Sequence, residues 1–372
     1  MKIVFITHYD NPYGANNALY KLIAGMKNNS ANEIIVVIPA KGIMSDKLEA
    51  IGARCIVSGI TQWQAPYVSP LRFFVKKIIR KSRIKKEVDN LYEILKDENI
   101  DVIHSNSSVI GHGAMLSMRL GCKHIWHIRE FAKEHFGMKY FWSDSFVKSA
   151  YEQAERLIVI SEALRKNFKF KYPNAKIDRI YDGVSGEYSH DKSEDIYKFI
   201  YAGYLYPMKQ QHIVVEAVKL LKDRNITNFE VHFSGDGKSD YKDILYKKVQ
   251  EYSLNNIIFD GYVPDIHSHM NKMDAGIIAS KYEGFGLVTV EYMLHGLPVI
   301  GFNDGGTAEI IENNKTGYLF DSVDELADYM EKLISDRHES EKMGELGKIR
   351  AKMFSEEENI SNILELYSGL ND

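Results

Sequence analysis

Residues 274–309 read DAGIIASKYEGFGLVTVEYMLHGLPVIGFNDGGTAE, and this stretch decides the fold. Its first apolar run, AGIIAS, predicts a short buried strand, and Lys281–Gly286 predicts a tight loop. A helix is expected over Leu287–Leu294, closed by Gly296, with a second strand at residues 299–301. Strand, loop, helix and strand in this order form a βαβ unit, which places the loop at the carboxyl edge of a parallel sheet.

The loop in this unit has the chemistry of an anion site. Gly284 and Gly286 allow a sharp turn and a close approach of the backbone to a ligand. The first amides of the following helix have no partner inside the helix, and the helix dipole favours an anion there. Glu283 and Glu291 flank this position with seven residues between them. A nucleotide sugar needs this combination: donors for its diphosphate and acceptors for its sugar and ribose hydroxyls.

The string E-G-F-G-x-x-x-x-E at residues 283–291, followed by G-x-P-V-I, GGTAEI and NNKTGYLF, resembles the donor-binding half of a retaining glycosyltransferase of the GT-B fold. The group it resembles most is the one often called family 4, and a weaker likeness runs along nearly the whole chain. The resemblance implies an α/β chain with two doubly wound, Rossmann-like domains facing a central cleft. It also implies transfer of a sugar from a nucleotide-diphosphate donor, with a UDP-sugar as the first expectation, and with retention of anomeric configuration.

The resemblance assigns residues to the donor. A lysine and the backbone at the helix start would hold the diphosphate: Lys209, Gly284, Phe285, Gly286 and Leu287. Glu283 would hold a sugar hydroxyl, Glu291 the ribose, and backbone groups around Val263 the base. His127, at the carboxyl end of a strand, would approach the anomeric carbon, although a strand-end histidine is more often a packing residue. The predicted catalytic residues are therefore His127, Lys209 and Glu283.

Some positions depart from the family pattern. Gly14 matches one of two glycines that face the diphosphate in the first strand-to-helix loop, but Tyr13 stands where the other would be. Tyr204 replaces an arginine that would offer a further cation to the diphosphate, and Asp182 replaces an asparagine. These departures leave open a second interpretation, in which the chain is a non-catalytic GT-B subunit that supports a partner enzyme.

Length and composition set the frame for these expectations. A chain of 372 residues suits two domains. We place the boundary in the polar stretch 185–195, with an acceptor-binding domain at residues 1–188 and a nucleotide-sugar-binding domain at residues 189–354. The last helix, residues 355–372, is expected to cross back to the first domain.

Several classes of protein and site are not supported by the sequence. The formal net charge of −4 argues against nucleic-acid binding. The two cysteines are far apart, which favours a reducing cytoplasm over a disulfide framework. The start MKIVFITHYD predicts a strand and no signal peptide, and no run of about 18 apolar residues predicts a membrane span. No metal is expected, since no cluster of carboxylates has ligand spacing and His267 and His269 fall on different sides of a helix.

One basic segment points to a membrane surface. Between Arg72 and Lys86 there is no acidic residue and eight basic ones: Arg72, Lys76, Lys77, Arg80, Lys81, Arg83, Lys85 and Lys86. Apolar residues interleave at roughly helical spacing, as in an amphipathic helix on an anionic leaflet. The alternative is a solvated helix whose phenylalanine and isoleucine side packs in the core. Membrane contact would favour a lipid-linked or polysaccharide-precursor acceptor at the inner face of the membrane, and its absence a small soluble acceptor in the cytosol.

Overall fold

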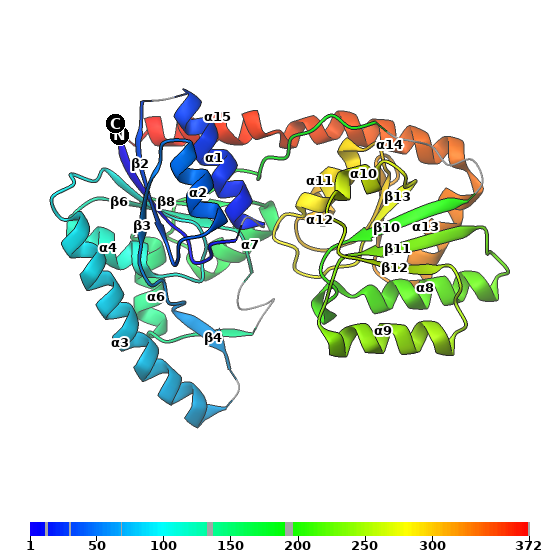
Figure 1. Cartoon of the computed structure of the whole chain (residues 1–372), viewed down its shortest axis with the longest axis horizontal. Helices are drawn as coiled ribbons and strands as arrows, with labels where there is room; N and C mark the ends of the chain where they lie inside the picture. The colour runs from blue at the N-terminus through cyan, green and yellow to red at the C-terminus, as the bar shows by residue number, and fades with distance from the viewer. Residues whose placement is uncertain (12–13, 30, 68, 132–136, 190–195, 371–372) are drawn as a thin grey trace. The chain divides into compact units, whose positions relative to one another are not determined.

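The computed structural model describes residues 1–11, 14–29, 31–67, 69–131, 137–189 and 196–370. Internal contacts divide the chain into two compact units (Figure 1). The first unit is Met1–Gly183 together with the segment that begins at Glu356, and the second unit is Val184–Ser355. The change of unit lies between Gly183 and Val184, slightly before the expected boundary at residues 188 and 189.

The first unit is built on a seven-stranded sheet in the order β3-β2-β1-β5-β6-β8-β9, with every neighbouring pair parallel. Its strands are β1 Lys2–Ile6, β2 Glu33–Ile38, β3 Arg54–Val57, β5 Val102–Ser105, β6 Lys123–Ile128, β8 Arg156–Val159 and β9 Ile177–Arg179. The central strands are β-branched, apolar and buried on both faces, as parallel strands covered by helices must be. The strand order turns back between β1 and β5, which makes the carboxyl ends of these two strands a switch point.

The helices of the first unit are α1 Ala15–Asn29, α2 Ile43–Ala50, α3 Pro70–Leu95, α4 His112–Leu120, α6 Asp144–Glu152, α7 Glu162–Lys171 and α15 Glu356–Ser368. The basic segment at residues 72–86 is part of one longer helix, α3, which continues to Leu95. A small antiparallel pair, β4 Gln64–Pro66 with β7 Met138–Tyr140, was not predicted. The helix α15 packs beside α1, and its Ile363 and Tyr367, followed by Leu370, enter the same core as β1.

A buried carboxylate ties three parts of the first unit together. Glu87 of α3 accepts hydrogen bonds from the amide of Thr61 at 2.9 Å and from its hydroxyl at 2.8 Å. It also lies 2.9 Å from Nε2 of His112 at the start of α4 and 3.1 Å from Nε of Arg83. Burial by itself would raise the pKa of Glu87, but the hydrogen bonds from His112 and Thr61 outweigh burial and lower the pKa to about 2.

The second unit has a six-stranded parallel sheet in the order β12-β11-β10-β13-β14-β15. Its strands are β10 Tyr197–Ala202, β11 Phe229–Ser234, β12 Ile257–Gly261, β13 Ala275–Ile278, β14 Val299–Phe302 and β15 Gly317–Phe320. Its helices are η1 Pro207–Lys209, α8 Gln211–Asp223, α9 Ser239–Glu251, α10 Ile266–Met270, α11 Leu287–Leu294, α12 Thr307–Ile310, α13 Val323–Ser335, α14 Arg337–Ala351 and η2 Lys352–Phe354. Residues of α8, α9 and α13 share one core with one face of the sheet, and α11 packs on the other face.

Among the residues that the structure describes, we find no helix with both the length and the apolar character that crossing a lipid bilayer requires.

Candidate functional site

The candidate site lies where the strand order of the second unit reverses, between β10 and β13. Open α/β sheets bind ligands at the carboxyl ends of strands at such a switch point. Strand β10 leads into η1, which ends at Lys209, and β13 leads into the loop that carries Glu283. The βαβ unit predicted from the sequence is present, because β13, α11 and β14 follow in order and β13 pairs in parallel with β14.

A tyrosine fixes α11 on the sheet behind this loop. The ring of Tyr292 covers Gly276 of β13 so closely that a Cβ at Gly276 would lie 2.1 Å from it. Its hydroxyl accepts a hydrogen bond of 2.6 Å from the amide of Ala202, the last residue of β10. Tyr292 therefore ties α11 to both strands that lead into the candidate site, and it leaves room for no side chain at Gly276.

The start of α11 is turned by a glycine in the left-handed region. Gly286, at φ 105° and ψ 55°, precedes Leu287, where the helix begins. A Cβ at Gly286 would lie 3.0 Å from Oγ1 of Thr289 and 3.3 Å from Oγ1 of Thr307. These two hydroxyls are buried and have no hydrogen-bond partner among the described residues. Buried polar groups are normally hydrogen-bonded, so the two threonine hydroxyls leave hydrogen-bonding capacity for a ligand beside the start of α11. Nothing in the sequence pattern pointed to the two threonines.

A second loop is pressed against the first through two glycines. The amide of Gly306 donates to the carbonyl of Glu283 at 2.8 Å. A Cβ at Gly305 would lie 2.4 Å from that same carbonyl oxygen, and a Cβ at Gly306 would lie 2.2 Å from the carbonyl oxygen of Phe285. The GGTAE segment at residues 305–309 therefore supports the backbone of the EGFG loop, and side chains at the two glycines would push the loops apart.

Lys209 and Glu283 form an ion pair in this frame. Their Nζ and Oε2 atoms are 2.9 Å apart, and the side chains are 33% and 22% exposed. Burial lowers the pKa of Lys209, but the negative charge of Glu283 outweighs burial, so the pKa is raised and the ammonium stays charged. The hydroxyl of Tyr201 donates to the carbonyl of Lys209 at 2.5 Å and holds η1 in place. The structure thus brings together two of the three predicted catalytic residues.

The other predicted donor-binding residues of the second unit have the following positions. Glu291 is half-buried within α11, and Gly284 is half-buried in the loop before it. Val263 is half-buried two residues beyond β12, on the segment that leads to α10. Tyr204 has 52% of its surface exposed, and its carbonyl accepts a hydrogen bond of 3.2 Å from Gln211. It therefore supplies no cation where the family pattern has an arginine.

In the first unit, Gly14 has a φ of 48° and lies directly before α1, where its carbonyl accepts from the amide of Ala18 at 3.1 Å. The position of Gly14 after β1 agrees with the predicted strand-to-helix loop. Tyr13, which stands in place of the second glycine, lies outside the described residues.

His127 is at the expected end of β6, but its side chain is fully buried in the first unit. Its Nδ1 lies 3.2 Å from Nε2 of His104, whose Nδ1 is 2.6 Å from the hydroxyl of Tyr367. Its Nε2 has no hydrogen-bond partner among the described residues. Burial and the neighbouring Arg129 hold the pKa of His127 well below its usual range, so the ring is neutral. No part of the His127 side chain is exposed on the first unit, so its contact with a sugar stays a prediction.

Arg129, two residues beyond His127, has its partners within the first unit. It forms a buried ion pair with Asp182, and its Nε donates to Oδ1 of Asn106 at 3.0 Å. Glu130 instead accepts from the amide and the hydroxyl of Ser108, both at 2.6 Å. The aspartate that replaces the family's asparagine at residue 182 therefore neutralises Arg129.

Comparisons with known proteins agree with this architecture. The family model of Glycosyltransferase Family 4 matches residues 14–187, and that of Glycosyl transferases group 1 matches residues 188–350. An uncharacterised glycosyltransferase of Methanocaldococcus jannaschii is 27% identical over 294 residues, which are 75% of this chain and 78% of that protein. An Escherichia coli UDP-Gal:alpha-D-GlcNAc-diphosphoundecaprenol alpha-1,3-galactosyltransferase is 27% identical over 279 residues, 68% of this chain and 71% of that one.

Among solved structures, Anabaena HepE in complex with UDP superimposes with a TM-score of 0.80, covering 99% of this chain and 100% of that chain at 21% identity. Two doubly wound units, with a glycine-turned helix start at the switch point of the second, define the GT-B class of glycosyltransferases. This chain belongs to the group 1 glycosyltransferases, family 4, and is an enzyme of that kind.

Proposed function

We propose that this enzyme transfers a sugar from a UDP-sugar to a lipid-linked or polysaccharide-precursor acceptor, with retention of anomeric configuration. The observation that carries the donor half of the proposal is the Lys209–Glu283 pair at 2.9 Å beside the glycine-turned start of α11. A fixed cation beside a helix start suits a diphosphate, and a carboxylate next to them suits a sugar hydroxyl. The buried hydroxyls of Thr289 in α11 and Thr307 at the start of α12 add further donors.

The proposed reaction needs little covalent chemistry from the protein. The acceptor oxygen forms a bond to the anomeric carbon on the face from which the diphosphate departs. The bond between that carbon and the phosphate oxygen breaks, and the acceptor proton moves to the departing phosphate. Lys209 and the amides of Phe285, Gly286 and Leu287 would stabilise the charge that develops on the diphosphate. Glu283 and Glu291 would hold sugar and ribose hydroxyls, so that positioning supplies much of the rate.

The relatives support UDP as the nucleotide. The Anabaena structures contain UDP and UDP-glucose, and the E. coli relative is described by a UDP-galactose donor and a diphosphoundecaprenol-linked acceptor. The test is thermal unfolding of the full chain with UDP, UDP-glucose, UDP-galactose, UDP-N-acetylglucosamine and the corresponding GDP compounds. We expect the UDP series to raise the melting temperature and the GDP series to leave it unchanged. A shift with GDP compounds alone would reject the assignment of the base.

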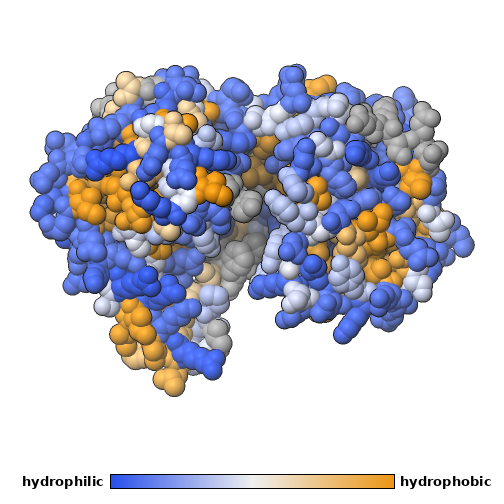
Figure 2. Space-filling model, in the orientation of Figure 1, coloured by the Kyte–Doolittle hydropathy of each residue, from blue (hydrophilic) through white to orange (hydrophobic). Residues whose placement is uncertain are grey.

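The acceptor half of the proposal rests on α3. The N-terminal half of this helix carries an exposed apolar stripe spaced three and four residues apart, formed by Leu71, Phe74, Val75, Ile78 and Ile79, which are 74%, 59%, 49%, 55% and 60% exposed. The buried residues of α3 all lie in its second half, from Ile84 onward. Figure 2 shows apolar side chains gathered over this end of α3. The alternative, a helix whose phenylalanine and isoleucine side packs in the core, describes Ile84 and also Phe73, whose ring centroid lies 5.4 Å from that of Phe141. It does not describe the exposed stripe.

The charges lie where a membrane helix needs them. At 100° per residue, Arg72, Lys76 and Arg83 fall on one flank of the apolar stripe and Lys81 on the other. Arg80 falls opposite the stripe, and Lys85 and Lys86 follow the stripe in its own sector. A helix that exposes an apolar stripe between basic residues lies in the headgroup region of an anionic leaflet. Each basic residue there contributes about 1 kcal/mol. A membrane-bound enzyme would receive a lipid-linked acceptor without releasing it to water.

Co-sedimentation with anionic liposomes tests this half. A Lys76→Gln, Lys81→Gln double variant should lose about 2 kcal/mol of binding, or roughly 30-fold in affinity. An Ile78→Ser variant should lose binding at unchanged charge. Lys166→Gln, an exposed lysine on α7, is the matched control and should bind as the wild type does. Equal sedimentation of all four proteins would reject membrane contact by α3 and favour a soluble acceptor.

A further inference from the structure

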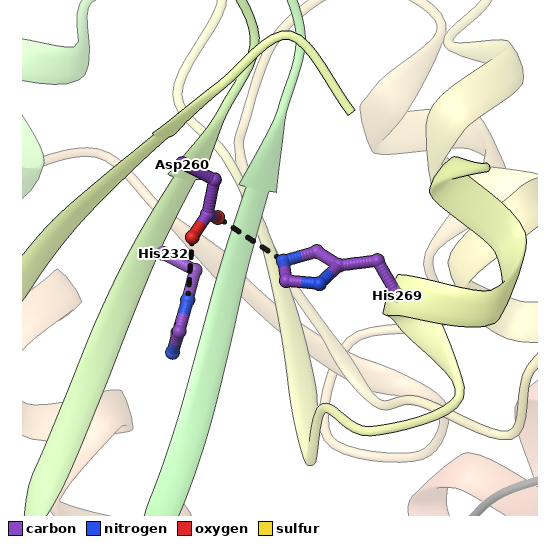
Figure 3. A group of neighbouring side chains, drawn as sticks. All are labelled: His232, Asp260 and His269. Atoms are coloured by element: carbon purple, nitrogen blue, oxygen red, sulfur yellow. Dashed lines mark hydrogen bonds and ion pairs between the residues drawn. The ribbon is translucent and has the colours of Figure 1, made fainter. Parts of the chain in front are cut away.

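Three metal-ligating side chains meet in the second unit (Figure 3). His232 comes from β11, Asp260 from the edge strand β12 and His269 from α10. Their candidate ligand atoms all lie within 4.8 Å of one another. His232 Nδ1 is 3.1 Å from Asp260 Oδ1, and His269 Nε2 is 3.1 Å from Asp260 Oδ2. Each carboxylate oxygen therefore faces one imidazole nitrogen.

The cluster also has the outer partners that metal ligands usually have. The other ring nitrogen of His232, Nε2, lies 3.3 Å from Oε2 of Glu230. The hydroxyl of Ser234 donates to Asp260 Oδ2 at 2.6 Å. Metal-binding imidazoles typically give their second N–H to a carboxylate, and ligating carboxylates are themselves hydrogen-bonded. Glu230 and Ser234 fix the orientation of two of the three inner side chains in this way.

The distances between the candidate ligand atoms fit a small tetrahedral ion once the three side chains move slightly closer together. Zinc binds imidazole and carboxylate at about 2.0–2.2 Å, which places tetrahedral ligand atoms about 3.3 Å apart. The two nitrogen–oxygen distances of 3.1 Å, one to each oxygen of Asp260, are close to this value. The widest separation, at most 4.8 Å, would close by up to about 1.5 Å. The side chain of His269 is 22% exposed, which gives the ion an entry path and leaves a position for a water ligand.

We propose that His232, Asp260 and His269 form a binding site for a zinc-class transition-metal ion, with Glu230 and Ser234 orienting the ligands. Two imidazoles with one carboxylate suit zinc, while magnesium and calcium prefer oxygen ligands alone. Asp260 and His269 stand on either side of residues 261–265, so a bound ion links the end of β12 to α10 and closes this loop at its base. The role of the ion is structural, and the site does not depend on the proposed transfer reaction.

The experiment uses the full chain, freed of metal with a chelator and checked for native circular dichroism. Zinc is titrated in competition with a chromophoric zinc chelator, and cobalt is added as a spectroscopic substitute. We expect one equivalent of tight binding, a visible absorption band of four-coordinate cobalt and a higher melting temperature with zinc. The expected loss of affinity is at least 10-fold for His269→Gln, whose partly exposed side chain makes it the substitution least disturbing to folding. Glu230→Gln should lose 10-fold to 100-fold, as outer-partner substitutions do.

Two histidine variants serve as matched controls. His338→Gln removes an exposed imidazole from α14, and His212→Gln removes the half-buried imidazole that contacts Tyr241. Both should bind one zinc ion as the wild type does. The proposal is overturned if the wild type shows no cobalt band and no zinc-dependent melting shift, which would leave the three residues as a hydrogen-bonded cluster alone. It is equally overturned if His269→Gln binds zinc as tightly as the wild type.

Discussion

The Lys209–Glu283 pair gives a prediction in which two neighbouring substitutions act in opposite directions. In the structure the ammonium of Lys209 is occupied by the carboxylate of Glu283 at 2.9 Å. A diphosphate must compete with that carboxylate for the same cation. Glu283→Gln removes the competitor and Lys209→Gln removes the cation, so their effects on UDP affinity should differ in sign.

The sizes follow from exposure. Because the two side chains are 33% and 22% exposed, solvent screens the pair and its net worth is about 1 kcal/mol. Glu283→Gln should therefore tighten UDP binding by up to about fivefold. Lys209→Gln removes a charge-assisted hydrogen bond to the diphosphate, worth about 1.5–3 kcal/mol, and should weaken UDP binding by roughly 10-fold to 150-fold.

Turnover separates the two roles further. Lys209→Gln should lower kcat by about 100-fold to 1,000-fold, because it removes a donor aimed at developing charge. Glu283→Gln should also lower turnover of the UDP-sugar, since it loses a sugar contact, while UDP itself binds at least as well as before. Calorimetric titration with UDP and UDP release from a UDP-sugar measure the two quantities. Lys247→Gln, an exposed lysine on α9, controls for a general loss of charge. The reasoning is refuted if Glu283→Gln weakens UDP binding as much as Lys209→Gln does.

Three further predictions concern stability in urea denaturation. The lowered pKa of Glu87 means that its ionised form stabilises the fold above about pH 4.5, and that this contribution disappears as the pH falls towards 2. Glu87→Gln should therefore be less stable than the wild type at pH 7 and equally stable near pH 2. A stability difference that does not change with pH would contradict this assignment. Gly276→Ala should cost about 1–3 kcal/mol because its Cβ would meet the ring of Tyr292, and a neutral result would show that α11 shifts freely. Tyr367→Phe should cost about 1–3 kcal/mol by leaving buried His104 without its 2.6 Å partner, whereas no loss would mean that another group replaces the hydroxyl.

The parts of the fold that the sequence predicted are those set by local patterns. The βαβ unit at residues 274–309 follows from apolar runs, glycines and one helix stop, all within a short stretch. The helix α13, Val323–Ser335, is also set locally, because Ser322 caps it and its apolar residues follow an amphipathic pattern. Membership of the glycosyltransferase family and the GT-B fold, inferred from the motif string, were confirmed.

The parts that were missed depend on contacts between distant segments. The pair β4 and β7 has three residues on each side and no hairpin turn between them. The spacing of apolar residues in α3 predicts a stripe, but it does not say whether protein or solvent covers that stripe. His127 was placed correctly at a strand end, yet its burial depends on His104 and, through it, on Tyr367. The cluster of His232, Asp260 and His269 joins residues of two strands and a short helix. The sequence spacing of His267 and His269 therefore could not indicate it.

The way α15 completes the first unit has a consequence for how the protein is made. Ile363, Tyr367 and Leu370 fill the core around β1, and Ile360 lies so close to Gly25 of α1 that a Cβ at Gly25 would be 2.2 Å from its Cδ1. During translation the strands of this unit leave the ribosome before the helix that seals them, and the whole second unit lies between them in the sequence. The second unit, contiguous from Val184 to Ser355, has its whole sequence available earlier. The nascent amino-terminal half therefore has an uncovered apolar face until α15 is made, and exposed apolar surface of this kind is prone to aggregation.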